Sequence, residues 1–294
     1  MDVEELRPTP PPARTTDMPL APTRTLLDGH EMPRLGLGTG PFDDDAAAAT
    51  VEHALGLGYR LIDTAARYGN EVGVGRGIAA SDVPRDDVFV TTKLRGSQQG
   101  YEATLAAFEE SRRRLGLEYV DLYLIHWPLP RRELYVESWE AFVHLRDEGL
   151  VRSIGVSNFT PSHIDRLLAE TSEIPVVDQI EIHPDFAQPD LCRALAERGV
   201  AAESWSPLGH ETGILEHPEL ARIAADHDRT VGQIVLRWHV QRETIPIPKS
   251  ADPGRLAENL DVFGFSLTEE DMDAVARLDS GNRAGGDPDV YEEL

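Results

Sequence analysis

Cysteine and long apolar runs are almost absent from this chain of 294 residues. Cys192 is the single cysteine, which excludes an internal disulfide and fits a reducing compartment. No run of about 18 apolar residues is present, so no membrane-spanning helix is expected. The first 25 residues carry acids and prolines where a secretory signal would have a basic stretch and an apolar segment. We therefore expect a cytoplasmic protein that does not bind membranes.

Positive charge is also scarce. The chain has 28 Lys and Arg against 52 Asp and Glu, which gives a formal net charge of −24. A surface of this sign repels phosphate backbones, so nucleic-acid binding is not expected. The excess of acid suggests a GC-rich genome, the acidic proteome of a high-salt cytoplasm, or both. Composition drift is the other explanation.

Only two of the basic residues are lysines, Lys93 and Lys249. A lysine ammonium is a compact charge whose proton chemistry can be tuned by burial, unlike the guanidinium of arginine. All the remaining positions of this type are arginine, so both lysines are candidates for a functional site.

A short apolar run followed by an amphipathic stretch recurs from residue 35 onward. The runs predict eight strands, at 35–38, 59–63, 88–92, 120–125, 152–156, 176–180, 200–203 and 244–247. The stretches between them predict helices that include 44–57, 101–115, 137–148, 161–170, 190–198 and 231–241. This alternation over about 250 residues predicts an α/β fold, a single (β/α)8 TIM barrel. A doubly wound sheet is the alternative, but no Gly-x-Gly-x-x-Gly follows the first strand.

The N-terminal part of the chain lies outside this repeat. Residues 1–22 are rich in Pro and Thr and predict a disordered extension, so the barrel domain is assigned to residues 23–294. Strand signals on either side of Asp28-Gly29 predict a short β-hairpin. The glycines at 36–40 and 73–77 lack the spacing of a nucleotide-binding loop, so no such loop is predicted there.

Titratable residues gather at the predicted strand ends, where TIM barrels carry their chemistry. Asp63 and Tyr68 follow the second strand, Lys93 the third and His126 the fourth. Each residue alone could be structural, as a helix cap, a surface charge or a satisfied core side chain. Their occurrence at three successive strand ends predicts a catalytic cluster.

The cluster suits the reduction of a carbonyl group. Hydride addition leaves an alkoxide that needs a proton, and Tyr68 has the hydroxyl group that can give it. At ~4 Å and an effective dielectric of ~20, the Lys93 ammonium would stabilise a phenolate by about 4 kcal/mol, which predicts a lowered pKa for Tyr68. Asp63 would hold Lys93 in place, and His126 would donate a hydrogen bond to the substrate carbonyl.

Several motifs of the chain match a known family. They are Asp63-Thr-Ala-Ala-Arg-Tyr68, Thr92-Lys93, Leu124-Ile-His126-Trp-Pro, Ile154-Gly-Val-Ser157-Asn158, Gln179-Ile-Glu181 and Ile247-Pro-Lys249-Ser250. With them the chain resembles the aldo-keto reductases from about Thr23 to the C-terminus, particularly short prokaryotic members similar to 2,5-diketo-D-gluconate reductase. The resemblance implies a barrel whose hairpin closes the bottom. It also implies an alcohol dehydrogenase (NADP+)-type oxidoreductase that uses NADPH/NADP+ to reduce an aldehyde or ketone, with Asp63, Tyr68, Lys93 and His126 as catalytic residues.

Cofactor contacts are expected across the mouth of the barrel from this cluster. Lys249, Ser250 and Arg255 supply an ammonium, a hydroxyl and a guanidinium group, which together suit the 2′-phosphate of NADPH. By the resemblance, Trp205 stacks on the nicotinamide ring, although a core tryptophan is the alternative. The resemblance further assigns to the cofactor Thr39, Asp63, Ser157, Asn158, Gln179, Ser206, Leu208, Glu258 and Asn259.

The substrate loops depart from the family pattern. Gly40 stands where many relatives have an aromatic residue, and Leu94-Arg95-Gly96 replaces the frequent Leu-Trp-Asn. The candidate pocket residues are Phe42, Tyr68, His126 and Trp127. The short segment after Gly281 suggests an open pocket. We expect a small-molecule carbonyl substrate and a monomer.

Two other classes of function are less favoured. A metal-dependent hydrolase could use Asp63, His126 and His183, but the chain lacks a His-x-His pair and any cluster at ligand spacing, so no metal is predicted. A non-enzymatic cofactor-binding module would not need the four candidate catalytic residues.

Overall fold

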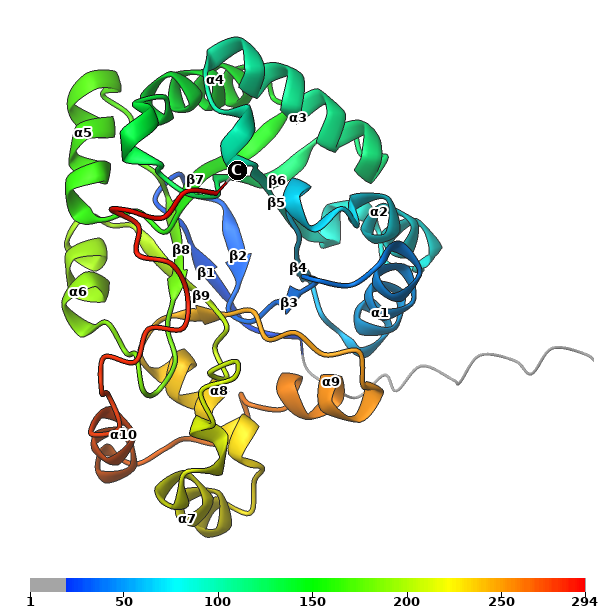
Figure 1. Cartoon of the computed structure of the whole chain (residues 1–294). Helices are drawn as coiled ribbons and strands as arrows, with labels where there is room; N and C mark the ends of the chain where they lie inside the picture. Colours follow the sequence, from blue (N-terminus) through cyan, green and yellow to red (C-terminus); the bar gives the residue numbers. More distant parts are fainter. Residues whose placement is uncertain (1–19, 294) are drawn as a thin grey trace, which may run out of the picture.

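Eight parallel strands form the centre of the computed structural model, which describes residues 20–293 (Figure 1). They are β3 (Leu37–Gly38), β4 (Leu61–Asp63), β5 (Phe89–Leu94), β6 (Val120–Ile125), β7 (Val151–Ser157), β8 (Val177–Glu181), β9 (Ala201–Trp205) and β10 (Ile245–Pro246). Each strand pairs with the next one along the chain. Backbone hydrogen bonds from Gly36 N to Pro246 O (3.0 Å) and from Gly38 N to Pro248 O (3.2 Å) join the two ends of the sheet. The predicted barrel is confirmed, and the doubly wound sheet is wrong because the strand order never reverses.

Helices surround the barrel (Figure 1). They are α1 (Asp44–Leu57), α2 (Glu71–Ala80), α3 (Tyr101–Leu115), α4 (Tyr135–Asp147), α5 (Pro161–Thr171), α6 (Pro189–Glu197), α7 (Pro218–His227), α8 (Val231–Gln241), α9 (Pro253–Leu260) and α10 (Glu269–Ala276). The bounds of α1, α3 and α8 agree with the prediction to the residue, because local signals set them. Asp43 accepts a hydrogen bond from Ala46 N at the start of α1, and Gly116 ends α3 with a φ of 67°.

The predicted strand ends are less accurate than the helix ends. The prediction closes the third and seventh strands at residues 92 and 203, whereas β5 continues to Leu94 and β9 to Trp205. The polar side chains of Lys93 and Ser204 are fully buried, so they remain part of the sheet. A polar residue therefore does not end a strand when the protein interior gives its side chain hydrogen-bond partners.

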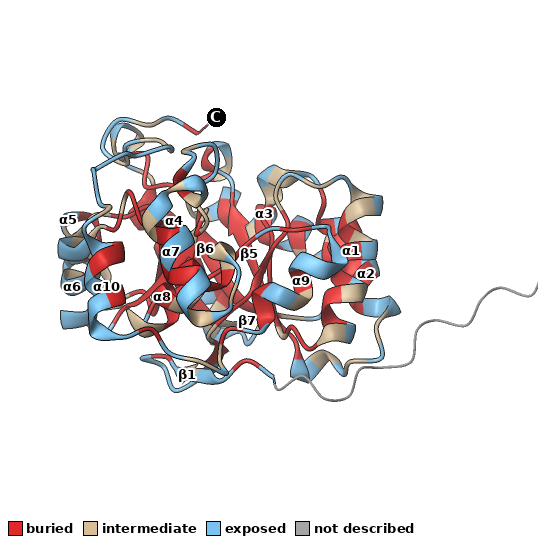
Figure 2. Ribbon diagram, turned by 90° about the horizontal axis from the view of Figure 1, so that it is seen from below, coloured by how far each residue is buried: buried red, intermediate tan, exposed pale blue. Residues whose placement is uncertain are grey.

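A two-stranded hairpin closes one end of the barrel. β1 (Thr23–Thr25) pairs antiparallel with β2 (Glu31–Pro33), as predicted. Leu26 and Met32 pack in a buried cluster with Leu61, Leu122 and Ile245 from the barrel strands. Figure 2 shows the hairpin at the opposite end of the molecule from the C-terminus. The open end therefore lies at the carboxyl ends of the strands.

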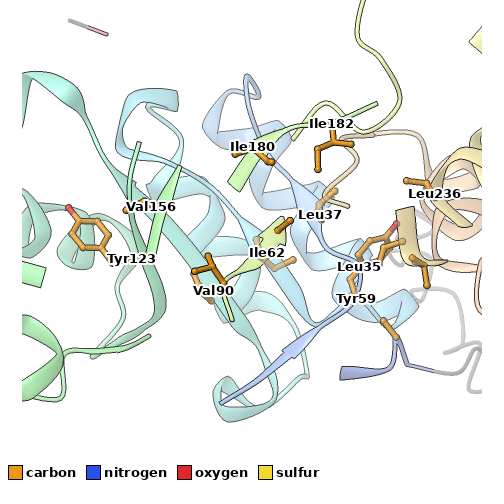
Figure 3. Packing of buried hydrophobic residues seen from close by; sticks show 14 of the residues in the cluster. Leu35, Leu37, Tyr59, Ile62, Val90, Tyr123, Val156, Ile180, Ile182 and Leu236 are labelled. Atoms are coloured by element: carbon orange, nitrogen blue, oxygen red, sulfur yellow. The ribbon is translucent and has the colours of Figure 1, made fainter. Parts of the chain in front are cut away.

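The main apolar core lies between the sheet and its helices. Figure 3 shows members of this cluster, among them Ile62, Val90 and Val156 from the strands and Leu236 from α8. The interior of the barrel near its open end is different, because it contains buried charged and amide side chains. Among them are Asp63, Lys93, Gln179 and Glu203.

The glycines at 73–77 serve helix packing. A Cβ atom on Gly73 would collide with the backbone of Asp44 in α1, and one on Gly75 would collide with Leu115 at the end of α3. These glycines let α2 lie close against both neighbours, so helix packing accounts for the glycine-rich segment at 73–77.

Most of the predicted N-terminal extension, at residues 1–19, and Leu294 at the end of the domain lie outside the described residues. Between residues 20 and 293 there is no helix of the length and apolarity needed to cross a membrane.

Candidate active site

A buried ion pair joins the ends of β4 and β5. Lys93 Nζ lies 2.6 and 2.8 Å from the two carboxylate oxygens of Asp63 and donates a third hydrogen bond to Thr64 O at 3.0 Å. Lys93 is fully buried and Asp63 is 1% exposed. Burial by itself lowers the pKa of Lys93, but the carboxylate of Asp63 outweighs it and the pKa lies above its ordinary value. Lys93 is therefore a permanent ammonium ion held by Asp63, as predicted.

Tyr68 lies at the end of a single helical turn, Ala66–Tyr68, that follows β4. Its hydroxyl is 3.5 Å from Lys93 Nζ. Burial raises the pKa of Tyr68 above its ordinary value, and the Lys93 ammonium offsets only part of this rise. The predicted lowering of this pKa is wrong for the protein alone, because it left out the burial of the hydroxyl, which is the largest effect, and the opposing charge of Asp63.

His126 follows β6, with its ring edge toward Tyr68 and the two ring centroids 6.0 Å apart. Its backbone oxygen accepts a hydrogen bond from Asn158 Nδ2 at 3.0 Å. Its Nδ1 lies 2.7 Å from Glu293 Oε1, although the ring is not oriented for a straight hydrogen bond. Burial lowers the pKa of His126 below its ordinary value against the opposing effect of Glu293. The four predicted catalytic residues thus lie together at three adjacent strand ends.

The C-terminal tail covers one side of this site. In Figure 1 it leaves α10 and crosses the open end of the barrel to finish among β5, β6 and β7. Tyr291 packs on Trp127 with ring centroids 4.4 Å apart. The buried carboxylate of Glu293 accepts hydrogen bonds from Gly96 N at 2.8 Å and from Arg67 at 3.3 Å. The expectation of an open pocket is therefore wrong on this side.

Sequence reasoning missed Arg67 and Glu293. A Cβ atom on Gly96 would collide with the backbone of Glu293, so the departure from the family pattern at Leu94-Arg95-Gly96 makes room for the tail. That glycine is the one signal in the sequence that a segment packs there.

A second buried cluster anchors the beginning of the tail. His183 lies between Glu181 (Nε2 to Oε1, 2.9 Å) and Asp185 (Nδ1 to Oδ1, 2.5 Å). Glu181 accepts hydrogen bonds from the backbone of Ala284 and Gly285, at 2.7 and 3.0 Å. Burial lowers the pKa of His183, but the two carboxylates outweigh it and the pKa lies above its ordinary value. The protonated form of His183 is thus favoured, and the ring holds in place the acids that bind the tail.

The three residues considered as metal ligands have separate partners. Asp63 binds Lys93, His126 contacts Glu293, and His183 is held by Glu181 and Asp185. Within the described part of the chain, no group of three or more His, Cys, Asp or Glu side chains could hold a metal ion.

Gln179 connects the ion pair to a further acid. Its Nε2 donates hydrogen bonds to Asp63 Oδ2 at 2.8 Å and to Glu203 Oε2 at 2.7 Å. Glu203 is fully buried, and burial together with Asp63 raises its pKa to about 8. Sequence reasoning missed Glu203, although an acid two residues before Trp205 on the same strand faces the same side of the sheet.

A cavity of about 720 Å³ opens above this cluster. Tyr68, His126 and Trp127 line it, as predicted for substrate contacts. Phe42 is not among the lining residues and instead lies under the Lys249 ammonium, 5.6 Å from Nζ to the ring centroid. Arg67, His210 and Glu211 also line the cavity and were not predicted.

The predicted cofactor contacts around the cavity, to the nicotinamide and to the pyrophosphate, divide into two groups. Asn158, Gln179, Trp205, Ser206 and Leu208 line the cavity, and Asp63 lies at its base. Trp205 is half-buried, and its Nε1 donates a hydrogen bond to Asn158 Oδ1 at 2.9 Å, which fixes the indole ring at the cavity wall. Thr39 and Ser157 are buried below the lining, where their hydroxyl groups bond to backbone oxygens of Asp63 and Gln179. These two residues are placed to support the site from beneath.

The predicted phosphate contacts lie at the start of α9. Lys249 and Arg255 are exposed, and neither forms an ion pair with another residue between positions 20 and 293. Ser250 accepts a hydrogen bond from Asp252 N at 3.1 Å, and Asp252 caps α9. Glu258 is exposed and Asn259 is buried one to two turns further along the helix. Two unpaired cations beside a helix N-terminus suit an anionic group.

Comparisons with known proteins point to one family. The model of the Aldo/keto reductase family matches residues 32–280. An aldo-keto reductase from Mycolicibacterium smegmatis is 48% identical over 272 residues, which cover 92% of this chain and 98% of that protein.

Two solved structures share the fold. A mutant of Gox0644 in complex with NADPH has a TM-score of 0.89 at 45% identity, covering 93% of this chain and 100% of the other. The Bombyx mori aldo-keto reductase in complex with NADP has a TM-score of 0.86 at 37% identity, covering 92% of this chain and 96% of the other. The chain belongs to the aldo/keto reductase family.

Proposed function

We propose that this protein reduces an aldehyde or ketone to the alcohol with NADPH, and that Tyr68 is the general acid. The observation that supports this most is the buried ammonium of Lys93, held by Asp63 and 3.5 Å from the Tyr68 hydroxyl, below a cavity of about 720 Å³. In the reverse direction the same site acts as an alcohol dehydrogenase of the NADP+ type.

Each side chain of the site has a separate role in the proposed reaction. Bound NADPH supplies the hydride. Tyr68 gives its proton to the oxygen of the substrate as negative charge develops there. Lys93 then stabilises the phenolate, and Asp63 keeps the ammonium in position. His126 faces the cavity and donates a hydrogen bond to the substrate carbonyl, which orients it toward Tyr68.

The residues of this chain fit the proposed cofactor. The ammonium of Lys249 and the guanidinium of Arg255, which form no ion pair with another described residue, suit a 2′-phosphate, and the start of α9 adds the positive end of a helix dipole. The indole ring of Trp205 is held at the cavity wall by Asn158 and offers a stacking surface. Both N–H groups of Gln179 are engaged, so its carbonyl oxygen is left to accept a hydrogen bond from a carboxamide.

The proposal extends to the working state of the protein. All the residues assigned to the site come from one chain, so a monomer is sufficient for activity. A cytoplasmic location suits the use of NADPH and the single free cysteine, Cys192.

An assay of NADPH oxidation tests the proposal. The absorbance of NADPH is measured over time with each member of a panel of aldehydes, ketoses and diketo acids. We expect turnover by the wild type and a loss of at least about 100-fold in Tyr68→Phe, with NADPH binding retained. Tyr119→Phe is the matched control, because Tyr119 bonds to Asp86 at the other end of the barrel and should keep full activity.

Two results would contradict the proposal. One is a wild type that binds NADPH but reduces no member of the panel. The other is a Tyr68→Phe variant that keeps more than about a tenth of the wild-type rate, which would assign the proton to another group.

A further inference from the structure

Glu203 is a buried acid that the proposed mechanism does not use. It lies on β9 with no exposed surface. Its Oε2 accepts a hydrogen bond from Gln179 Nε2 at 2.7 Å, and its Oε1 has no hydrogen-bond partner among the described residues. The charged groups that face it are Asp63 on β4 and Lys93 on β5. Its neighbour strands contribute the neutral Gln179 amide from β8 and the apolar Ile245 from β10.

The charges of Asp63, Lys93 and Glu203 balance only when Glu203 is protonated. Lys93 contributes one positive charge and Asp63 one negative charge. An ionised Glu203 would add an uncompensated negative charge with an oxygen that no donor reaches, and burial of such a charge is costly. A neutral carboxylic acid leaves at most one weakly polar group unpaired, which costs far less.

We propose that Glu203 is a positioning residue that remains protonated, and therefore neutral, during catalysis. Through the Gln179 amide it keeps the Asp63–Lys93 pair beneath Tyr68 electrically balanced. This inference rests on the proposed carbonyl reduction. Gln179 is the physical link, because its two N–H groups bind Asp63 and Glu203 at the same time. The charge of Glu203 therefore acts on the Asp63–Lys93 pair, which supports Tyr68.

The proposal has a consequence for the dependence of the rate on pH. When Glu203 loses its proton, its negative charge opposes the phenolate that Tyr68 forms as it gives up its own proton. The reduction should therefore slow as Glu203 ionises, in the alkaline range given by its raised pKa. A unit charge in such a chamber, at an effective dielectric of ~20, changes a proton-transfer step by roughly tenfold.

The test compares Glu203→Gln with the wild type. Glutamine has the shape of the neutral acid and cannot ionise, so kcat/KM at pH 7 should stay within about threefold of the wild type. The alkaline fall of kcat/KM, on the order of tenfold in the wild type, should be absent or displaced to higher pH in the variant.

Asp178→Asn is the matched control. Asp178 is also fully buried on β8, and burial raises its pKa too, but it accepts a hydrogen bond from Phe159 N and belongs to the opposite face of the strand from Gln179. Its replacement should leave the alkaline fall unchanged.

Infrared spectroscopy gives a second readout that needs no activity. The wild type and Asp178→Asn should both show the C=O stretch of a protonated carboxyl group at neutral pH, and this band should disappear on alkaline titration. The band in the Asp178→Asn background tests Glu203 even if Glu203→Gln does not fold. In a folded Asp178→Asn/Glu203→Gln double variant the band should be lost, whereas Glu203→Gln alone keeps any band that Asp178 contributes.

The outcomes separate the two proposals. An alkaline profile of Glu203→Gln that coincides with the wild type, or the lack of a titrating carboxyl band in Asp178→Asn, would overturn the role of Glu203 while carbonyl reduction stands. A wild type that binds NADPH and reduces no carbonyl would overturn the proposed function and the role of Glu203 with it.

Discussion

Replacement of Lys93 by methionine should destabilise the protein strongly, because it leaves the Asp63 carboxylate buried without a counter-charge. The ammonium has no exposed surface and makes three hydrogen bonds of 3.0 Å or less, two of them to Asp63. Removal of one partner of a buried ion pair costs about 3–5 kcal/mol, and the bond that Gln179 still gives to Asp63 relieves only part of this cost. We expect a loss of about 4 kcal/mol in the free energy of unfolding.

A double-mutant cycle measured by urea unfolding separates the charge from the packing. Lys93→Met with Asp63→Asn removes both charges, so the double variant should recover all but about 2 kcal/mol of the wild-type stability at an unchanged m-value. Arg112→Met is the control, since Arg112 pairs with Glu109 on the exposed face of α3 and should cost at most about 1 kcal/mol. A loss below about 1 kcal/mol in Lys93→Met, or a double variant as unstable as the single one, would refute the argument.

Three further predictions concern the cofactor, the tail and its anchor. Lys249→Met should raise the KM for NADPH about tenfold or more and spare the KM for NADH, and an equal rise with both cofactors would contradict a 2′-phosphate contact. Glu293→Gln removes the carboxylate that favours the protonated form of His126 and should therefore lower the pKa of His126. The acid limb of the pH profile of kcat/KM should then move to lower pH. An acid limb at the same pH as in the wild type would refute this contact. The pKa of His183 is raised in the folded protein, so His183 stabilises the fold most when it is protonated. Urea unfolding should therefore show the largest stability difference between wild type and His183→Gln below pH about 6.5. This difference should shrink as the pH rises through the pKa of the folded protein. A difference that grows with pH would contradict a charged His183.

Much of the fold and the central part of the site could be predicted because both depend on local patterns. The alternation of apolar runs and amphipathic stretches specifies the strands and helices, and their number specifies the barrel. Parallel strands bring their carboxyl ends together, so Asp63, Lys93 and His126 had to meet once the barrel was assigned. No long-range information was needed for this step.

The tail could not be predicted, because its contacts join residues far apart in the chain. Glu293 binds Gly96 across 197 positions, and no periodicity in either segment marks the other. From the sequence, the short segment after Gly281 predicts an open pocket. Only the docked chain shows that a carboxylate from this end reaches His126.

The error in the pKa of Tyr68 has a related cause. A pairwise argument from Lys93 alone predicts a more acidic phenol. The folded site adds burial and the charges of Asp63 and Glu293, which all depend on where other segments place their side chains. A residue pattern identifies the members of such a cluster, but the sign of a pKa shift depends on the sum of all of them.

In the proposed mechanism, the hydrogen bonds of Lys93 explain how a weakly acidic tyrosine can still transfer a proton. The ammonium has three hydrogens, and Asp63 and Thr64 already accept all three at 3.0 Å or less. The Tyr68 hydroxyl, at 3.5 Å, is held next to the ammonium without a short bond to it. As Tyr68 loses its proton, the phenolate becomes a far stronger acceptor than the Thr64 carbonyl, and one N–H of Lys93 can turn to it. The stabilisation by Lys93 then grows with the charge of the transition state, which is the condition for catalysis. An arginine, with five donors in a rigid planar fork, could not exchange one partner for another in this way.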